Sequence, residues 1–310
     1  MSSDLVLARR YTRDRCYEAF DNLDVSEATR ATYIAGLTPF INFIENNQFN
    51  LNAFLDFKRM LRSRDDLATS TKNKYLVSAR IFLKELHRRG IMPTDITHNI
   101  RNFKLDKRHK INGLDDREVE LIEWWCQRNY DNPRDVSIMC LLLYQGLRIG
   151  EVCKLNWEDV LWRTNTILIK GKGRDDKEAV FLHPVTVRAL KMYYKIQHLD
   201  LGGLRPRGAV FRSKSIPSNK GRITERGLRH IVKKAFAEQE IDKQVHGFRH
   251  TFVTRLVKQF HGDVTKIAPF TRHRSLEMLQ VYNDAVLHDK DYVDYIKAFG
   301  DVNLYAKMPY

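Results

Sequence analysis

The second half of the chain carries six side chains of the types that bind a phosphate group and attack it. In chain order they are Arg148, Lys172, His246, Arg249, His273 and Tyr282. A phosphodiester is anionic and repels nucleophiles, so its cleavage needs fixed cations on the non-bridging oxygens, where negative charge develops. Guanidinium groups suit this task because they stay charged and bind two oxygens with one rigid fork. Arg148 and Arg249 are therefore candidates for a phosphate clamp.

A histidine and a tyrosine complete the chemistry that these residues predict. His246 lies three residues before Arg249, so one helical turn presents both side chains on one side, at a helix start that itself favours anions. Tyr282 is the candidate nucleophile. Because a tyrosine hydroxyl has a reference pKa of about 10, it must lose its proton during the attack. His246 or the neighbouring charges are the candidates that assist this proton transfer.

Each of these residues, taken singly, also has an ordinary structural explanation. Arg148 follows a glycine turn where surface arginines occur, Lys172 stands beside a hairpin tip, and His246 or His250 fits a satisfied polar group near a core. The functional interpretation depends on the whole ordered set. Two positions have rivals, namely Lys170 for the lysine and, for the tyrosine, Tyr292, Tyr295, Tyr305 and Tyr310.

The ordered set resembles the tyrosine recombinases, the phage integrase and Xer-type family. The family pattern is matched by Gly146-Leu-Arg-Ile-Gly-Glu151, Gly171-Lys-Gly173 and His246-Gly-Phe-Arg249, then His273 and Tyr282. The resemblance selects Lys172 over Lys170, and Tyr282 over its rivals by its distance from His273. It implies that Lys172 protonates the leaving 5′ oxygen, that His273 hydrogen-bonds the scissile phosphate and that Glu151 orients the site. One departure is Phe270-Thr-Arg-His273, where the family commonly has Leu-Gly-His.

The resemblance implies a site-specific DNA recombinase that cleaves and rejoins strands through a 3′-phosphotyrosyl intermediate, in integration, excision or resolution. One phosphodiester replaces another, so no ATP and no metal cofactor are expected, and the sequence has no Gly-x-x-x-x-Gly-Lys-Ser/Thr loop and no evident metal-ligand spacing. We interpret the acidic pairs Asp65-Asp66, Asp115-Asp116 and Asp175-Asp176 as solvated loops. The alternatives are a type IB topoisomerase-like nicking and resealing enzyme and a catalytically silent DNA-binding regulator.

Composition agrees with a partner made of nucleic acid. The 310 residues have a formal net charge of +15, a field that attracts polyanions. Residues 1–111 hold 20 basic and 13 acidic residues, and residues 112–310 hold 33 and 25, so both halves are basic. The longest apolar run, residues 138–144, is far shorter than the ~18 residues that cross a bilayer. We expect a cytoplasmic, nucleoid-associated protein whose four cysteines are reduced.

Periodic apolar residues predict an all-helical first domain. The pattern indicates helices over 26–47 and 70–89, and Lys74, Lys84 and Arg88 fall opposite the apolar stripe of the second one, where they are candidates for contacts with DNA phosphates. We assign residues 1–105 to a helical core-binding (SAM-like) domain. The polar, basic stretch 106–113 is typical of a linker.

The elements that must position the chemistry lie in residues 114–310. A buried helix over 137–144 ends at Gly146, and another begins near Gly150, so Arg148 lies at the turn between them. Two β-rich runs, 166–172 and 178–183, predict a hairpin, and helices follow over 184–197, 224–240 and 247–260. We expect Pro269 to interrupt the helix before His273.

The predicted fold class is mainly α with a small β-sheet, arranged as a two-domain clamp around duplex DNA. The resemblance implies a dimer at each recombination site, a tetramer in synapsis and accessory DNA-bending or directionality proteins. It also implies that a tail from about residue 284 docks on a neighbouring protomer. The target sequence and the outcome of recombination are not specified by these patterns.

Overall fold

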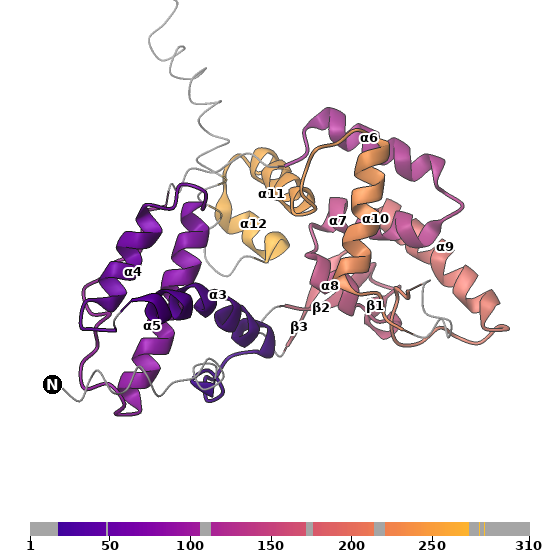
Figure 1. Cartoon of the computed structure of the whole chain (residues 1–310). Helices are drawn as coiled ribbons and strands as arrows, with labels where there is room; N and C mark the ends of the chain where they lie inside the picture. The colour runs from indigo at the N-terminus through magenta and orange to yellow at the C-terminus, as the bar shows by residue number, and fades with distance from the viewer. Residues whose placement is uncertain are drawn as a thin grey trace, which may run out of the picture. The chain divides into compact units, whose positions relative to one another are not determined.

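The chain folds as two compact units, residues 1–107 and 108–310. A computed structural model describes residues 18–47, 49–105, 113–171, 176–213 and 221–272, together with Leu279 and Tyr282. The described helices include none that combines the length and the apolar character needed to cross a lipid bilayer. Figure 1 shows the helices and strands of both units.

The described residues of the first unit form helices joined by turns and loops. Its helices are α3 (Glu27–Asn46), α4 (Ala53–Arg62) and α5 (Thr69–Arg88). The hydroxyl of Ser26 accepts a hydrogen bond from the backbone N–H of Thr29 and caps the start of α3, the helix predicted over 26–47. Helices α3 and α5 pack on each other around buried phenylalanines. Phe40, Phe57 and Phe82 form edge-to-face pairs in this core.

The second unit is built around one helix whose middle is apolar and buried. Its helices are α6 (Asp116–Arg128), α7 (Pro133–Gln145), α8 (Ile149–Lys154), α9 (Pro184–Asp200), α10 (Glu225–Glu238), α11 (Gly247–Gln259) and α12 (Val264–Thr271). Every residue of α7 from Ser137 to Leu143 is buried, because α9 and α11 both pack against this helix (Figure 1). A helix that is apolar on all sides has to be covered on all sides.

A small antiparallel sheet follows α8. Its strands are β1 (Val160–Leu161), β2 (Thr166–Lys170) and β3 (Lys177–Phe181), in the order β1-β2-β3. The β2 and β3 pairing ends at Lys170 opposite Lys177, and Lys177 forms an ion pair with the buried carboxylate of Asp159. The predicted hairpin and the mainly helical fold class with a small sheet are confirmed. Strand β1, which is only two residues long, was not predicted.

Two local predictions are wrong, and each has a physical reason. The Asp115-Asp116 pair does not lie in a loop but at the start of α6. The Asp115 carboxylate accepts a hydrogen bond from the backbone N–H of Glu118, and the Glu118 carboxylate accepts one from the backbone N–H of Asp115. This capping box starts α6, and the Asp-x-x-Glu spacing was the signal that the sequence offered. Pro269 does not interrupt α12, which continues to Thr271. Near a helix end, proline removes one backbone hydrogen bond, and the short helix tolerates this loss.

Gly146 allows the chain to turn between α7 and α8, and we expect its replacement by alanine to be costly. Its φ is +57°, and a Cβ atom here would lie 2.3 Å from Cδ1 of Phe252. The left-handed backbone and the overpacking together predict a loss of about 2 to 4 kcal/mol in the free energy of unfolding. Urea denaturation of Gly146→Ala measures this loss.

Gly202→Ala is the matched control, because Gly202 has a similar φ of +63° with nothing within 4 Å of the added Cβ. It should lose only about 1 kcal/mol, the backbone part of the effect. Equal losses in the two variants would show that the contact with Phe252 plays no part.

Candidate active site

Five of the residues predicted for the site, counting Glu151, are described by the structure, and they gather in the second unit. Arg148 and Glu151 start α8, His246 and Arg249 start α11, and Tyr282 comes from the end of the described chain. The two others, Lys172 and His273, lie outside the described residues, as do the rival tyrosines.

Glu151 holds Arg148 at the start of α8. Its carboxylate accepts hydrogen bonds from the backbone N–H of Arg148 at 2.8 Å and from the guanidinium Nη1 of Arg148 at 3.0 Å. The side chain of Glu151 is 5% exposed and that of Arg148 is 38% exposed. One guanidinium nitrogen of Arg148 is therefore bound to a buried carboxylate, and the rest of the side chain keeps solvent-accessible surface for a ligand.

Arg249 is buried beneath this pair and connects two distant turns. Its Nη1 donates to the carbonyl oxygen of Gly146 at 2.8 Å, and its Nη2 donates to the carbonyl oxygen of Thr271 at 2.5 Å. Burial, assisted by the charges of Arg148 and Arg272, lowers the pKa of Arg249 to about 10. The group stays protonated at neutral pH, so it remains a fixed cation that also holds the ends of α7 and α12.

His246 is a neutral side chain at the start of α11. Burial lowers the pKa of its ring, and the neighbouring charges of Arg249 and Arg148 lower it further. Its ring meets the ring of His250 edge to face, with centroids 4.8 Å apart. At pH 7 His246 can therefore donate one hydrogen bond to a phosphate oxygen, or accept one proton, without first losing a charge.

Arg272 adds a third guanidinium to the site. Its Nη2 lies 3.1 Å from Oε2 of Glu151, and both side chains are only 5% exposed. It occupies the position where the related pattern has glycine, and its φ of 54° is the left-handed conformation that glycine adopts easily. Three arginines thus surround one carboxylate, which leaves an excess of two positive charges among these four side chains.

We expect Arg272→Gly to destabilise the protein, although the substitution removes the strain of the left-handed backbone conformation at this position. Glycine removes about 1 kcal/mol of left-handed strain, but breaking a buried ion pair costs about 3 to 5 kcal/mol. The net loss of unfolding free energy is about 2 to 4 kcal/mol, measured by urea denaturation. In the control Glu240→Gly, an exposed residue with the same φ of 54°, the change should stay within about 1 kcal/mol. A gain of stability in Arg272→Gly would mean that the ion pair contributes nothing.

Tyr282 is 7% exposed and its hydroxyl has a defined partner. The Oη atom lies 2.6 Å from Nδ1 of His250. Burial raises the pKa of Tyr282, and the charges of Arg249 and Arg148 oppose this rise. Sequence reasoning did not include His250 among the candidate site residues, because its place directly after Arg249 fitted a satisfied polar group equally well.

The candidate DNA-contact residues of the first unit are all on the surface of α5. Lys74, Lys84 and Arg88 are exposed, as their positions opposite the apolar stripe predicted. Arg88 is committed to the buried carboxylate of Glu85 through two hydrogen bonds of 2.7 and 2.6 Å. Their contact with DNA stays a prediction.

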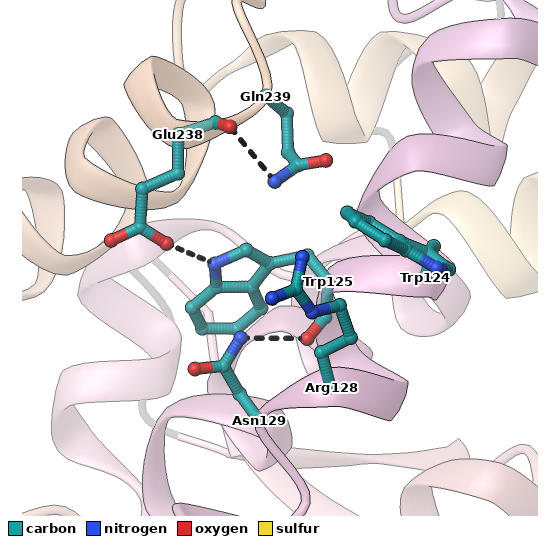
Figure 2. A pocket seen from close by; sticks show the side chains of 6 residues that line it. All are labelled: Trp124, Trp125, Arg128, Asn129, Glu238 and Gln239. Carbon is teal, nitrogen blue, oxygen red and sulfur yellow. Dashed lines mark hydrogen bonds between the residues drawn. The ribbon is translucent and has the colours of Figure 1, made fainter.

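A cavity of about 320 Å³ lies elsewhere in the second unit and takes no part in this site. It is lined by Trp124, Trp125, Arg128, Asn129, Glu238 and Gln239 (Figure 2). The indole N–H of Trp125 donates to the carboxylate of Glu238 at 2.6 Å, and the guanidinium of Arg128 stacks on Trp124. The hydrogen bond between Trp125 and Glu238 joins α6 to α10, so the cavity lies where these two helices pack together.

Two tyrosine recombinases are similar in sequence to most of this chain. Tyrosine recombinase XerC of Bacillus subtilis (strain 168) is 27% identical over 268 residues, which cover 83% of this chain and 86% of the relative. Tyrosine recombinase XerC of Caldanaerobacter subterraneus subsp. tengcongensis is 25% identical over 292 residues, which cover 90% of this chain and 75% of the relative.

Solved structures agree in fold. The XerH recombinase bound to a palindromic difH substrate superposes with a TM-score of 0.71 at 17% identity, covering 93% of this chain and 85% of XerH. A lambda integrase dimer bound to a COC′ core site superposes with a TM-score of 0.66 at 15% identity, covering 87% and 75%. Residues 112–287, more than half of the chain, match the model of the phage integrase family. The chain therefore belongs to the phage integrase family, and it is a tyrosine recombinase.

Proposed function

We propose that this recombinase cuts and rejoins duplex DNA at specific sites through a covalent bond between Tyr282 Oη and a 3′ phosphate. The observation that carries the proposal is the position of this hydroxyl, 2.6 Å from Nδ1 of His250, the residue that directly follows Arg249 in the first turn of α11. The charges of Arg249 and Arg148 oppose the rise in the pKa of Tyr282 that burial causes. A buried tyrosine beside a cluster of arginines is suited to attack an anion that the arginines hold.

The arginine cluster supplies the electrostatic part of the reaction. The attacked phosphate gains negative charge as it becomes pentacoordinate, and the excess positive charge around Glu151 opposes that gain. Arg148 offers its solvent-accessible surface to one non-bridging oxygen, and Arg249 lies beneath it as a fixed charge. His246 donates a hydrogen bond to the same phosphate. The site can therefore favour the transition state over the bound substrate.

The leaving 5′ oxygen needs a proton, and we assign this role to Lys172, with His273 as a further hydrogen-bond donor to the phosphate. Support for Lys172 comes from its place in the chain, two residues after β2 ends at Lys170. The facing strand is held at its start by the ion pair between Lys177 and Asp159.

The proposed division of labour follows the two units. Residues 1–105 act as the core-binding domain, with Lys74, Lys84 and Arg88 toward DNA phosphates, and residues 114–310 carry the chemistry. The lambda integrase relative is a dimer on its core site, and we extend this arrangement to a dimer at each site and a tetramer in synapsis. Contacts with phosphates supply affinity, so the log of the binding constant should fall by roughly 0.9 per phosphate neutralised as log salt rises.

The test starts with a random duplex library. The purified full chain is incubated with the library, covalent adducts are trapped under denaturing conditions, and the DNA ends are sequenced. We expect one recurrent sequence. A plasmid that carries two copies of this sequence should then recombine, whereas a plasmid without it should keep its supercoils.

The alternatives give different results in the same experiment. Scattered DNA ends with relaxation of any plasmid would identify a topoisomerase-like enzyme. Sequence-specific binding without any covalent adduct would identify a regulator. Either result would contradict the proposal.

A further inference from the structure

We infer that His250 is a catalytic residue of this site, the general base that takes the proton of Tyr282 Oη during strand cleavage and returns it during rejoining. The inference rests on the proposed function, because it concerns the same nucleophile. None of the motif positions that define the site includes this histidine, and the assignment comes from its contact in the folded chain.

The contact has the geometry of proton transfer. Oη of Tyr282 and Nδ1 of His250 are 2.6 Å apart across 32 residues of sequence, and the ring centroids are 5.4 Å apart. The distance between the two heavy atoms lies at the short end of the range, about 2.6 to 3.2 Å, that allows a general base to take a proton from a hydroxyl. His250 lies in the first turn of α11, directly after Arg249, so the rigid element that holds the phosphate clamp also holds the base.

The surroundings explain why a base is needed. Burial raises the pKa of Tyr282, and the arginines offset only part of that rise, so the hydroxyl is protonated at neutral pH. Among the described residues, the charged or titratable groups around the pair include His246 and Arg249 on α11, Arg148 and Glu151 on α8, and Arg272 after α12. The arginines cannot accept a proton, and Glu151 is buried between Arg148 and Arg272. His250 has an acceptor nitrogen that faces the hydroxyl.

The proton and the bonds balance without another reactant. With the proton of the neutral ring on Nε2, Nδ1 accepts the tyrosine proton while the Oη–P bond forms and the P–O5′ bond breaks. The departing O5′ takes its proton from the general acid, for which we propose Lys172. In rejoining, the 5′ hydroxyl gives its proton back to Lys172 while the O5′–P bond forms and the Oη–P bond breaks, and protonated His250 returns its proton to Oη of Tyr282.

The test uses the full chain and a nicked duplex that carries the sequence recovered from the library experiment. His250→Ala removes the base, and His250→Gln keeps hydrogen-bonding capacity but accepts no proton at neutral pH. The matched control is His230→Gln, an exposed histidine on α10. Cleavage rates are measured from pH 6 to 9, and DNA binding is measured by gel shift in the same buffers.

We expect both His250 variants to bind DNA as the wild type does and to cleave about 10²- to 10⁴-fold more slowly at pH 7, the usual contribution of a general base. Their rates should climb with pH toward the pKa of the tyrosine, and added imidazole should restore part of the rate of His250→Ala. His230→Gln should cleave at the wild-type rate. A wild-type rate in His250→Gln would overturn the inference, because hydrogen bonding alone would then suffice.

A substrate with sulfur in place of O5′ distinguishes the general-base role of His250 from the general-acid role of Lys172. Sulfur leaves without a proton, so this substrate should restore a Lys172→Ala variant and leave the His250 variants slow. Rescue of His250→Ala by sulfur would overturn the inference. The outcome is separable from failure of the proposed function, because in that case the wild type would form no adduct or adducts at scattered sequences, or Tyr282→Phe would still form adducts.

Discussion

Tyr282→Phe should abolish the covalent protein–DNA adduct and all recombination. Phenylalanine fills the same buried volume but has no oxygen to bond to phosphorus, so the loss should be on the order of 10⁴-fold or more. The fold should survive, because the change removes one hydrogen bond to His250, worth about 1 kcal/mol. Adducts recovered under denaturing conditions and digested to peptides provide the measurement.

The control for this variant is Tyr130→Phe. Tyr130 is 70% exposed, so the Tyr130→Phe variant should form adducts at the wild-type rate. Wild-type DNA should be attached to the peptide that contains Tyr282. Adducts that persist in Tyr282→Phe, or DNA attached to a peptide from residues 292–310, would place the nucleophile on another tyrosine.

Arg148→Ala should slow strand cleavage by about 10²- to 10³-fold, the usual effect of removing one donor that stabilises developing negative charge. The expected cost in stability is small, because the arginine side chain is 38% exposed and Glu151 keeps its ion pair with Arg272. Arg148→Lys should recover only part of the rate, since an ammonium lacks the planar fork that binds two oxygens. Single-turnover cleavage with DNA in excess over Kd measures the chemical step apart from binding.

Arg229→Ala serves as the matched control for lost positive charge. Arg229 is 56% exposed and pairs with Glu225 one turn away on α10, an exposed pair worth about 0.2 to 1 kcal/mol. It should cleave at the wild-type rate at saturating DNA. If Arg148→Ala weakened only the binding of DNA and left the cleavage rate unchanged, Arg148 would be a binding residue without a role in the transition state.

Local sequence determined much of the chain. The apolar spacing and Ser26 predicted α3 within a residue or two, and the run of apolar residues before Gly146 predicted the buried α7. These features depend on neighbours three or four positions apart, which a helix brings together whatever the rest of the chain does. The ordered motifs, from the Gly-Leu-Arg turn to the tyrosine, were enough to predict the family.

The contacts within the site were decided by the tertiary structure alone. His250 meets Tyr282 across 32 residues, Arg249 reaches the carbonyl oxygen of Gly146 across 103, and Arg272 reaches Glu151 across 121. The sequence presents His250 as one polar residue on a helix, and nothing in its spacing says which distant segment that helix face will meet. Such pairs form because the burial of α7 beneath α9 and α11 brings the helix ends together. Motif spacing therefore predicted the reacting residues, whereas packing decided which side chains contact them.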